Sequence, residues 1–443
     1  MEALLGAKLG ELDAEETPEG LLGVLTSDDT EMRLSEMFAI GRRGSAAGTA
    51  VLVATLSDED PRVRRIAATN LGEITDSPAV VPALVGALQD EDALVRGTAG
   101  GSLIALSNPE CVSVVMRLLD SEEEAVAGEA ARVLGRLRSN APGVVPALLA
   151  NLGRLDEARL ALVQFGEPAI MGLVAALDSA DEQVRVAAID ALGTIHSRAG
   201  ARVPRPAHEA PGRVSRSFAA SSPDWIGVQL PSLPDSLSAL LHAQSDPSTD
   251  VRVQLAQALY QAGLQADEPA VVPALLAMLD DEGDGVRDQA LRSLEVLGWA
   301  GIRNGWKPAL AEALAEQATP RLLRLMETLA GHDHQTADLV GSALIGLGAT
   351  AASSLVEALA SRNYQTRFQA ARALHFLPVD SIPVLDIAPA LIAALEEDSP
   401  VRAYAAATLR FMGPEVARLV PERWQETVAE AWIDTRGGCD VLG

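Results

Sequence analysis

Histidine and carboxylate side chains gather at one place in this 443-residue sequence, the segment GHDHQTAD. His332 and His334 are separated by one residue, and Asp333 and Asp338 stand beside them. Imidazole nitrogens and carboxylate oxygens are common zinc ligands, so this group could hold a metal ion. The spacing indicates no third ligand, however, and a polar turn between two helical segments accounts for the same residues. We therefore predict no metal site and no cofactor.

Arginine is the second residue type whose clustering could do chemistry. Residues 198–216 contain five arginines and a single acidic residue, within an irregular stretch, 197–235, that is rich in Pro, Ser and Ala. Such a cluster could meet phosphate groups, but the formal net charge of −26 opposes nucleic acid as the main partner. Two hypotheses remain for the stretch, a linker between two helical halves and a binding arm. In the arm, Arg205, Arg213 and Arg216 are the candidate contacts.

Tryptophan marks further breaks in the pattern of the chain. All five tryptophans lie at or after residue 225, outside the repetitive helical segments. In the segment GWAGIRNGWKPAL, Trp299 and Trp306 flank a stretch that we expect to form a Gly-rich turn. Because tryptophan is enriched in binding sites, Trp225, Trp299 and Trp306 are candidate binding residues. The alternative is that their rings fill gaps where helices pack irregularly.

Sequence motifs of enzymes are missing. The chain has no G-x-S-x-G, P-loop, H-E-x-x-H or C-x-x-C pattern, so we predict no catalytic residue. Its two cysteines cannot build a disulfide framework. It shows neither a basic start followed by an apolar run nor an apolar stretch long enough to cross a membrane. We expect a cytoplasmic protein that does not enter the membrane.

A repeated unit fills most of the chain. The segment VVPALVGALQDEDALVRGTAG from Val80 recurs from Val271 as VVPALLAMLDDEGDGVRDQAL and from Ile387 as IAPALIAALEEDSPVRAYAA. One arginine keeps its place in each copy, and the steps from 33 to 64, 64 to 96, 252 to 287 and 367 to 402 are 31, 32, 35 and 35 residues. These arginines are Arg33, Arg64, Arg96, Arg185, Arg252, Arg287, Arg367 and Arg402.

Each copy has the pattern of two amphipathic helices joined by an acidic turn. Apolar residues three and four apart, such as Val81, Leu84 and Val85, form one stripe on the first helix. The turn Asp or Ser should cap the second helix, and Asp60-Pro61 and Ser399-Pro400 supply the proline favoured at its first position. Glycines follow the second helix where a C-terminal cap is expected, at Gly72, Gly193, Gly298 and Gly413. Because neither helix can bury its stripe alone, the pairs must stack.

The unit, which can be written V-P-A-L-x-x-x-L-x-D-x-D-x-x-V-R-x-x-A-x-x-A-L-G, resembles the HEAT-repeat family, in particular the bacterial HEAT-like repeats of phycobilisome lyases. The resemblance covers about 20–196 and 236–413. In that family the turn Asp and the helix Arg form a ladder between neighbouring repeats. The resemblance therefore implies that three pairs are structural, Asp90 with Arg96, Asp280 with Arg287, and Glu397 with Arg402.

We predict an all-α protein, a right-handed α-solenoid (superhelix) of about ten HEAT-like helix pairs. The expected division is N-terminal HEAT-like repeats over 1–196, an irregular Pro/Arg-rich insertion over 197–235, C-terminal HEAT-like repeats over 236–413, and a capping helix and tail over 414–443.

The function that the sequence favours is a non-catalytic scaffold or adaptor, which binds a protein or peptide partner on the concave face lined by the second helices. The net charge of −26 favours a basic partner. The alternative is an enzyme component or an accessory protein of a modifying enzyme, lyase-like as the resemblance suggests. Nucleic-acid binding through the Arg-rich insertion is a third hypothesis, which the acidic charge opposes.

Overall fold

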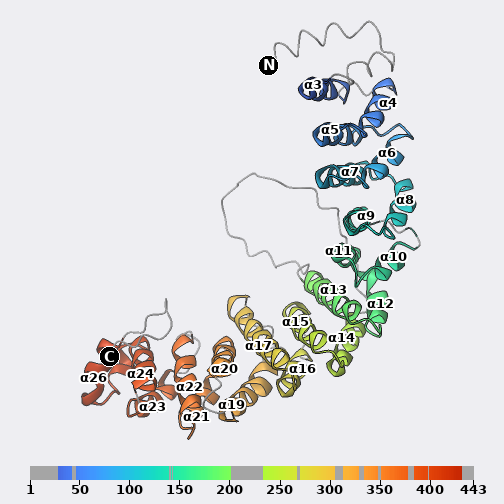
Figure 1. The fold of residues 1–443 in the computed structure, drawn as a ribbon. Helices are drawn as coiled ribbons and strands as arrows, with labels where there is room; N and C mark the ends of the chain where they lie inside the picture. Colours follow the sequence, from blue (N-terminus) through green and yellow to red (C-terminus); the bar gives the residue numbers. More distant parts are fainter. Residues whose placement is uncertain are drawn as a thin grey trace, which may run out of the picture. The chain divides into compact units, whose positions relative to one another are not determined.

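Each repeat folds into a short helix, an acidic turn and a second helix (Figure 1). The computed structural model describes residues 28–41, 46–138, 141, 143–200, 233–266, 270–304, 313–328, 334–347, 351–377, 384–397 and 399–431. All regular structure in these residues is helical, so the prediction of an all-α fold of stacked HEAT-like pairs is confirmed. None of the described helices is both long and apolar enough to cross a membrane.

The chain forms two compact units, Met1–Ala191 and Leu192–Gly443, and α13 begins in the first and ends in the second. The first unit contains α3 (Thr30–Gly41), α4 (Ala46–Thr55), α5 (Pro61–Leu71), α6 (Val80–Ala87), α7 (Ala93–Leu106), α8 (Glu110–Leu118), α9 (Glu124–Leu137), α10 (Val144–Ala150), α11 (Asp156–Phe165), α12 (Glu167–Ala176) and most of α13 (Glu182–Gly200).

The second unit continues the same alternation of first and second helices. It contains α14 (Leu233–His242), α15 (Thr249–Ala266), α16 (Val271–Ala277), α17 (Asp284–Asn304), α19 (Thr319–Thr328), α20 (His334–Gly346), α21 (Ala352–Ala358), α22 (Tyr364–Phe376), α23 (Val384–Ala394), α24 (Ser399–Phe411), α25 (Pro414–Ala417) and α26 (Glu422–Glu430), with short 3₁₀ or π turns at Ala243–Ser245, Met278–Asp280 and Leu314–Ala318.

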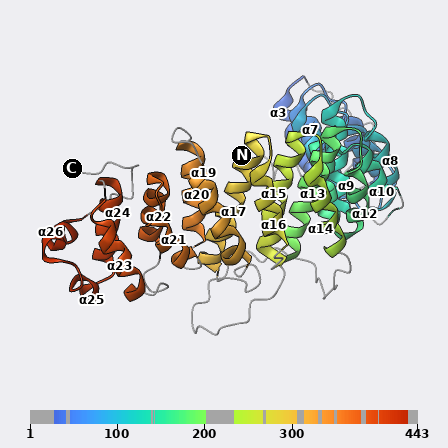
Figure 2. The same cartoon turned by 90° about the horizontal axis from the view of Figure 1, so that it is seen from below.

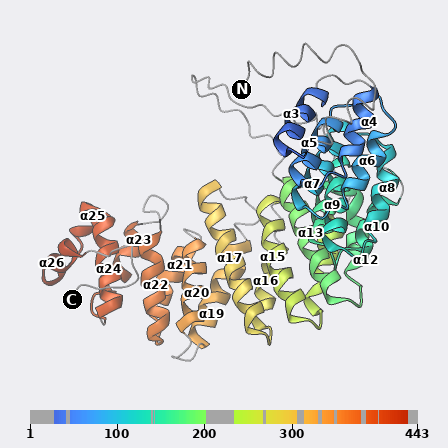
Figure 3. The same cartoon turned by 45° about the horizontal axis from the view of Figure 1, so that its top comes forward.

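Second helices form one row in each unit and first helices form another. Figure 3 shows the two rows of the first unit, with α3, α5, α7 and α9 beside α4, α6, α8 and α10. In the second unit α15, α17, α20, α22 and α24 lie side by side (Figure 2). Second helices pack on one another more extensively than first helices do. Small side chains permit this, since a Cβ on Gly135 of α9 would lie only 2.7 Å from the Cα of Ala161 in α11.

Aspartates at the turns cap the second helices α5 and α7, as predicted, whereas α9 and α11 have no side-chain cap. The Asp60 carboxylate accepts the backbone N–H of Arg62, and Pro61 occupies the first position of α5. Asp92 accepts the N–H groups of Leu94 and Val95 at the start of α7. These bonds satisfy donors that have no partner inside the helix.

Glycine caps only some of the second helices. Gly72 ends α5, and Gly413 adopts φ 95°, a conformation that favours glycine. The expected caps at Gly193 and Gly298 are wrong, because α13 and α17 continue past them. Gly193 serves packing instead, since a Cβ there would lie 2.8 Å from the Cβ of Ala258. Close helix packing offsets the roughly 1 kcal/mol that an interior glycine costs.

A buried arginine joins each of several second helices to the following repeat. In Arg64, Nε and Nη2 donate to the two carboxylate oxygens of Asp90 at 2.8 and 2.9 Å, while Nη1 donates to the Asp58 carbonyl at 2.7 Å. Arg252 repeats this geometry with Asp281, at 2.7 and 2.9 Å. Ion pairs of the same kind join Arg33 to Asp58 and Arg367 to Glu397.

The turn carboxylate also organises its own turn. Asp90 Oδ1 accepts the N–H of Asp92 at 2.9 Å, and Asp281 Oδ1 accepts the N–H of Gly283 at 2.8 Å. Only 7% of the Arg64 side chain and 9% of the Asp90 side chain are exposed. The two nearly buried charges therefore pair with each other, and the carboxylate also accepts a hydrogen bond from its turn. These bonds offset the cost of removing both charges from water.

A second kind of hydrogen bond joins neighbouring second helices, and it runs from a later helix back to the one before it. Six residues after the ladder arginine, some second helices carry Asn or Ser, which donates to a carbonyl of the preceding second helix. The three bonds run from Asn70 to Met37, from Ser102 to Ala68 and from Ser293 to Ala256, at 2.7, 2.8 and 2.8 Å. These buried polar side chains therefore have hydrogen-bond partners, and the second helices remain closely packed.

The ladder exists, but the three pairs implied by the resemblance are wrong: Asp90 with Arg96, Asp280 with Arg287, and Glu397 with Arg402. Arg96 donates to the backbone carbonyl of Asp90 at 2.7 Å, while the Asp90 carboxylate binds Arg64 of the preceding repeat. Arg287 and Arg402 likewise donate to carbonyls of their own turns. The guanidinium reaches back under its own turn, whereas the carboxylate of that turn faces the repeat before it.

The described helices leave 201–232 between α13 and α14, so most of the predicted 197–235 insertion lies outside the described residues. At the other end, α25 and α26 cover much of the predicted capping region 414–443, and Val428 is the buried side chain of α26. The division into four segments stays a prediction.

Arg252→Ala should destabilise the protein by about 1.5–3 kcal/mol, because it removes charged hydrogen bonds and leaves the Asp281 carboxylate without its cation. Arg287→Ala is the matched control, since its guanidinium bonds only within its own turn and is 35% exposed. Urea unfolding followed by circular dichroism would compare the two. Equal losses would contradict a cross-repeat role for Arg252.

Asp281→Asn should lower the melting temperature at pH 7 and lose this effect in acid. The Arg252 guanidinium lowers the pKa of Asp281 below its usual range. A carboxylate with a lowered folded-state pKa stabilises the fold above its unfolded pKa of about 3.9, and this stabilisation is lost as the pH falls through the folded-state value. Melting curves from pH 7 to pH 3 would measure the gap between variant and wild type. A gap that stays constant to pH 3 would refute the assignment.

Candidate protein-binding surface

The repeat separates residues that the fold uses from residues that it leaves exposed. Counted from the arginine of the repeat, residues one, five, eight and nine positions later are exposed or half-buried on α17 and α22. On α17 these residues are Asp288, Arg292, Glu295 and Val296, and on α22 they are Phe368, Arg372, His375 and Phe376. The same backbone frame thus presents acidic side chains on one helix and aromatic ones on the other.

An aromatic surface covers α22 and α24 in the second unit. It consists of Tyr364, Phe368, His375 and Phe376 on α22 and of Tyr404 and Phe411 on α24. The chain has 14 aromatic residues of the types Phe, Trp and Tyr (6, 5 and 3), and five of them lie on these two 13-residue helices. That concentration exceeds what a core of small aliphatic side chains requires.

Ring contacts run across the boundary between the two helices. Tyr364 and Phe368 stack with ring centroids 6.4 Å apart, and Phe368 meets the edge of Tyr404 at 5.7 Å. His375 lies 5.8 Å from Tyr404 and 5.5 Å from Phe411. Edge and offset contacts of this kind hold rings in fixed positions. The surface is therefore preformed and would lose little freedom when a partner covers it.

Large apolar area of these rings remains open to solvent. Tyr364 is 39% exposed, Phe376 37% and Phe411 55%. Tyr404 is only 4% exposed and contacts the rings of Phe368 and His375. Exposed aromatic rings gathered in one place are typical of sites that bind other molecules.

His375 contributes a neutral ring to this surface. Burial lowers the pKa of His375, so the imidazole is uncharged near pH 7. The Thr408 hydroxyl of α24 lies 3.4 Å from its Nδ1.

Arginine is the only charged residue type on the two helices, since neither α22 nor α24 contains Asp or Glu. Arg372 contacts Asp338 of α20 at 3.4 Å and Gln369 at 3.2 Å. Arg410 donates to the backbone carbonyl of Ala431 at 2.7 Å. The two helices that carry the aromatic surface therefore bear arginine as their charged residue type, within a strongly acidic chain.

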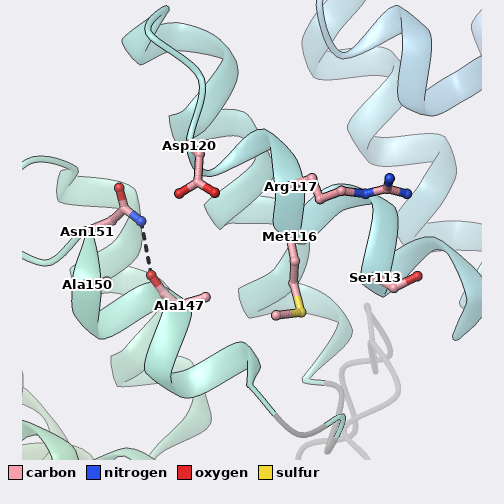
Figure 4. A pocket seen from close by; sticks show the side chains of 7 residues that line it. All are labelled: Ser113, Met116, Arg117, Asp120, Ala147, Ala150 and Asn151. Atoms are coloured by element: carbon pink, nitrogen blue, oxygen red, sulfur yellow. Dashed lines mark hydrogen bonds between the residues drawn. The ribbon is translucent and has the colours of Figure 1, made fainter.

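A hollow between α8 and α10 of the first unit is the other cavity of note (Figure 4). Its volume is about 390 Å³, and Met116, Arg117, Asp120 and Asn151 are among the residues that line it. The Asn151 amide donates to the carbonyl of Ala147, one turn back in its own helix. In Figure 4 the Arg117 guanidinium points away from Asp120. These polar groups do not converge on a common point, so the hollow makes a poor ligand site.

Most sequence-predicted site residues fall outside the described part of the chain. Arg205, Arg213, Arg216 and Trp225 lie within 201–232, and Trp306 lies within 305–312. Trp299 belongs to α17, which runs on to Asn304, so residues 300–304 of the expected Gly-rich turn are helical and the rest of it lies outside the described residues. These candidates stay predictions.

His334 begins α20, while His332 and Asp333 lie outside the described residues. In the part of the chain that the structure describes, no group of three or more His, Cys, Asp and Glu side chains could hold a metal ion.

Sequence reasoning missed the aromatic surface because these residues keep the repeat pattern. The tryptophans, by contrast, break that pattern. A signal was nevertheless present, since Tyr364, Phe368 and Phe376 stand four and eight residues apart, on one helical face.

Known proteins share this fold. A family model for HEAT repeats matches residues 18–104, 81–165 and 170–295. No curated protein sequence matches the chain significantly. Crystal structures of Kap121p are similar. A Kap121p mutant has 13% identity and a TM-score of 0.55, with 95% of this chain and 47% of that chain covered.

The karyopherin Kap121p bound to the extreme C-terminus of the protein phosphatase Cdc14p has 13% identity and a TM-score of 0.56, with 94% and 47% covered. Kap121p bound to Nup53p has 12% identity and a TM-score of 0.55, with 93% and 46% covered. The chain thus spans about half the length of these structures, and at such identity the likeness shows the fold. Because the HEAT model matches well over half of the sequence, the chain belongs to the HEAT-repeat family.

Proposed function

We propose that the protein is a non-catalytic scaffold that binds a segment of a protein partner on its row of second helices, with the aromatic surface of α22 and α24 as the docking site. The observation that carries the proposal is the exposure of Tyr364, Phe376 and Phe411 in a chain that contains only 3% aromatic residues. The fold does not need these rings to be exposed, and burying them against a partner would release apolar area from water.

The preformed geometry supports a docking role. The His375 ring contacts both Phe376 and Phe411, and it also contacts Tyr404, so binding costs little side-chain freedom. Kap121p, whose fold is similar, has been solved with the C-terminal end of a phosphatase bound. That precedent supports peptide binding as a use of this fold and leaves the partner of this chain to experiment.

Other parts of the sequence-based hypothesis remain proposals beside this one. The net charge of −26 favours basic partners during long-range encounter. The lyase-like alternative rests on the resemblance to phycobilisome-lyase repeats. Neither carries an observation on described residues that equals the aromatic surface.

The Phe376→Ala/Phe411→Ala variant should lose its partner while keeping its fold. The full-length protein would be used as bait in lysate of its source cells, and retained proteins would be quantified by mass spectrometry. Aromatic residues at the centre of an interface contribute about 2 kcal/mol or more, so retention of the partner should fall at least about tenfold. Because both rings are exposed, the free energy of unfolding should fall by only about 1 kcal/mol, which lowers the melting temperature by a few degrees.

A Leu160→Ala/Met171→Ala variant provides the matched control. It also removes two exposed apolar side chains, 46% and 69% exposed, but from α11 and α12 of the first unit. We expect this control to retain the same proteins as wild type. If no protein distinguishes the aromatic variant from the control, the aromatic surface is not the docking site.

A further inference from the structure

The charges around the aromatic surface identify the chemistry of its partner. The chain as a whole has 61 Asp and Glu against 35 Lys and Arg, yet α22 and α24 together carry four arginines and no acid. At the corresponding positions α17 carries Asp288 and Glu295 where α22 carries Phe368 and His375. The charge carried by these two helices is therefore opposite in sign to the net charge of the chain.

Two of the four arginines serve the fold, and the other two, Arg372 and Arg410, are the candidate contacts for a partner. Arg367 binds Glu397 of the next repeat, and Arg402 donates to carbonyls of its own turn. Arg372 stands midway between Phe368 and Phe376, four residues from each, and therefore on the same helical face.

Neither Arg372 nor Arg410 is held by a strong ion pair. Arg372 lies 3.4 Å from Asp338, whose side chain is 64% exposed, so solvent weakens that contact. Arg410 directly precedes Phe411, and its described bond is to a neutral carbonyl, that of Ala431. A guanidinium has five N–H donors, which leaves several available to an incoming carboxylate.

Along one face of α22, Phe368, Arg372 and Phe376 thus alternate aromatic rings with a cation, and on α24 Arg410 adjoins Phe411. From this alternation, and resting on the proposed function, we infer that the aromatic surface binds an acidic segment of a protein partner, in which large apolar side chains alternate with Asp or Glu. The apolar side chains cover Phe376 and Phe411, and the carboxylates meet Arg372 and Arg410. This partner segment is opposite in charge to the one that the net charge favours.

A nucleic acid would be the other polymer able to use rings and cations together, by stacking its bases and pairing its phosphates. Its continuous charge needs a longer run of cations than two. An acidic protein segment, whose carboxylates can be spaced to suit two arginines, fits the surface better.

Fluorescence polarisation with the full-length protein tests this inference. The probes are a fluorescein-labelled 12-residue peptide with Phe or Leu at every fourth position and Asp or Glu between, the same peptide with Lys in place of each acid, and a labelled single-stranded oligonucleotide of 12 bases. We expect the acidic peptide to bind most tightly and the Phe376→Ala/Phe411→Ala variant to weaken it at least about tenfold.

Charge reversal distinguishes electrostatic recognition from apolar contact alone. Arg372→Glu/Arg410→Glu should weaken the acidic peptide at least about tenfold. Arg65→Glu/Arg136→Glu, on exposed positions of α5 and α9, changes the net charge equally and should leave affinity within about twofold. Should the reversed variant misfold by circular dichroism, Arg410→Gln replaces it, because glutamine can still donate to the Ala431 carbonyl.

Three results would overturn the inference: preference for the lysine peptide or the oligonucleotide, no binding of the acidic peptide, or equal affinity in the reversed variant and its control. Failure here is distinguishable from failure of the proposed function. If the aromatic variant loses a cellular partner yet the acidic peptide does not bind, the docking site stands and only its assigned chemistry is wrong.

Discussion

The bond between a second-helix arginine and the turn carboxylate of the following repeat is the contact on which the stack depends. Arg64 and Asp90 are both nearly buried, so each needs the other to compensate for lost hydration. The same carboxylate holds the turn that starts its own second helix. A single aspartate thus links the capping of one helix to the position of the previous one. Some of the acidic excess of the chain therefore has a structural purpose and carries no information about partners.

The sequence predicted the arginine positions well and their partners poorly. The interval between Arg33, Arg64 and Arg96 follows from the helix pair itself and is visible in the letters alone. Which carboxylate each guanidinium meets depends on how one pair rotates against the next, and that rotation is decided by contacts such as Gly135 against Ala161. The local sequence pattern of a single repeat does not predict this rotation. Gly193 failed as a predicted cap for the same reason, because its small size serves a neighbouring helix.

The binding surface escaped prediction for a related physical reason. Phe368 and Phe376 have the spacing of an amphipathic stripe, and in a sequence such residues are indistinguishable from core. Only the packed structure shows which stripe faces the neighbouring helices and which faces water. Once the arginine of the repeat is used as a reference, exposed positions can be compared between repeats, and α22 differs from α17 at once. Comparison within one chain thus supplies a contrast that no single helix offers.

The ladder has a consequence for how the chain can change in length. Arg33, Arg64, Arg252 and Arg367 each form an ion pair with the turn of the following repeat, so a rung requires that one repeat follows another in phase. Excision of residues 34–64, which equals the 31-residue step between Arg33 and Arg64, would place Arg33 opposite Asp90 and restore the rung. Removal of half that length would leave Arg33 without a carboxylate and Asp90 without a cation. Such a chain can therefore be shortened or extended by whole repeats, because every buried charge then keeps a partner.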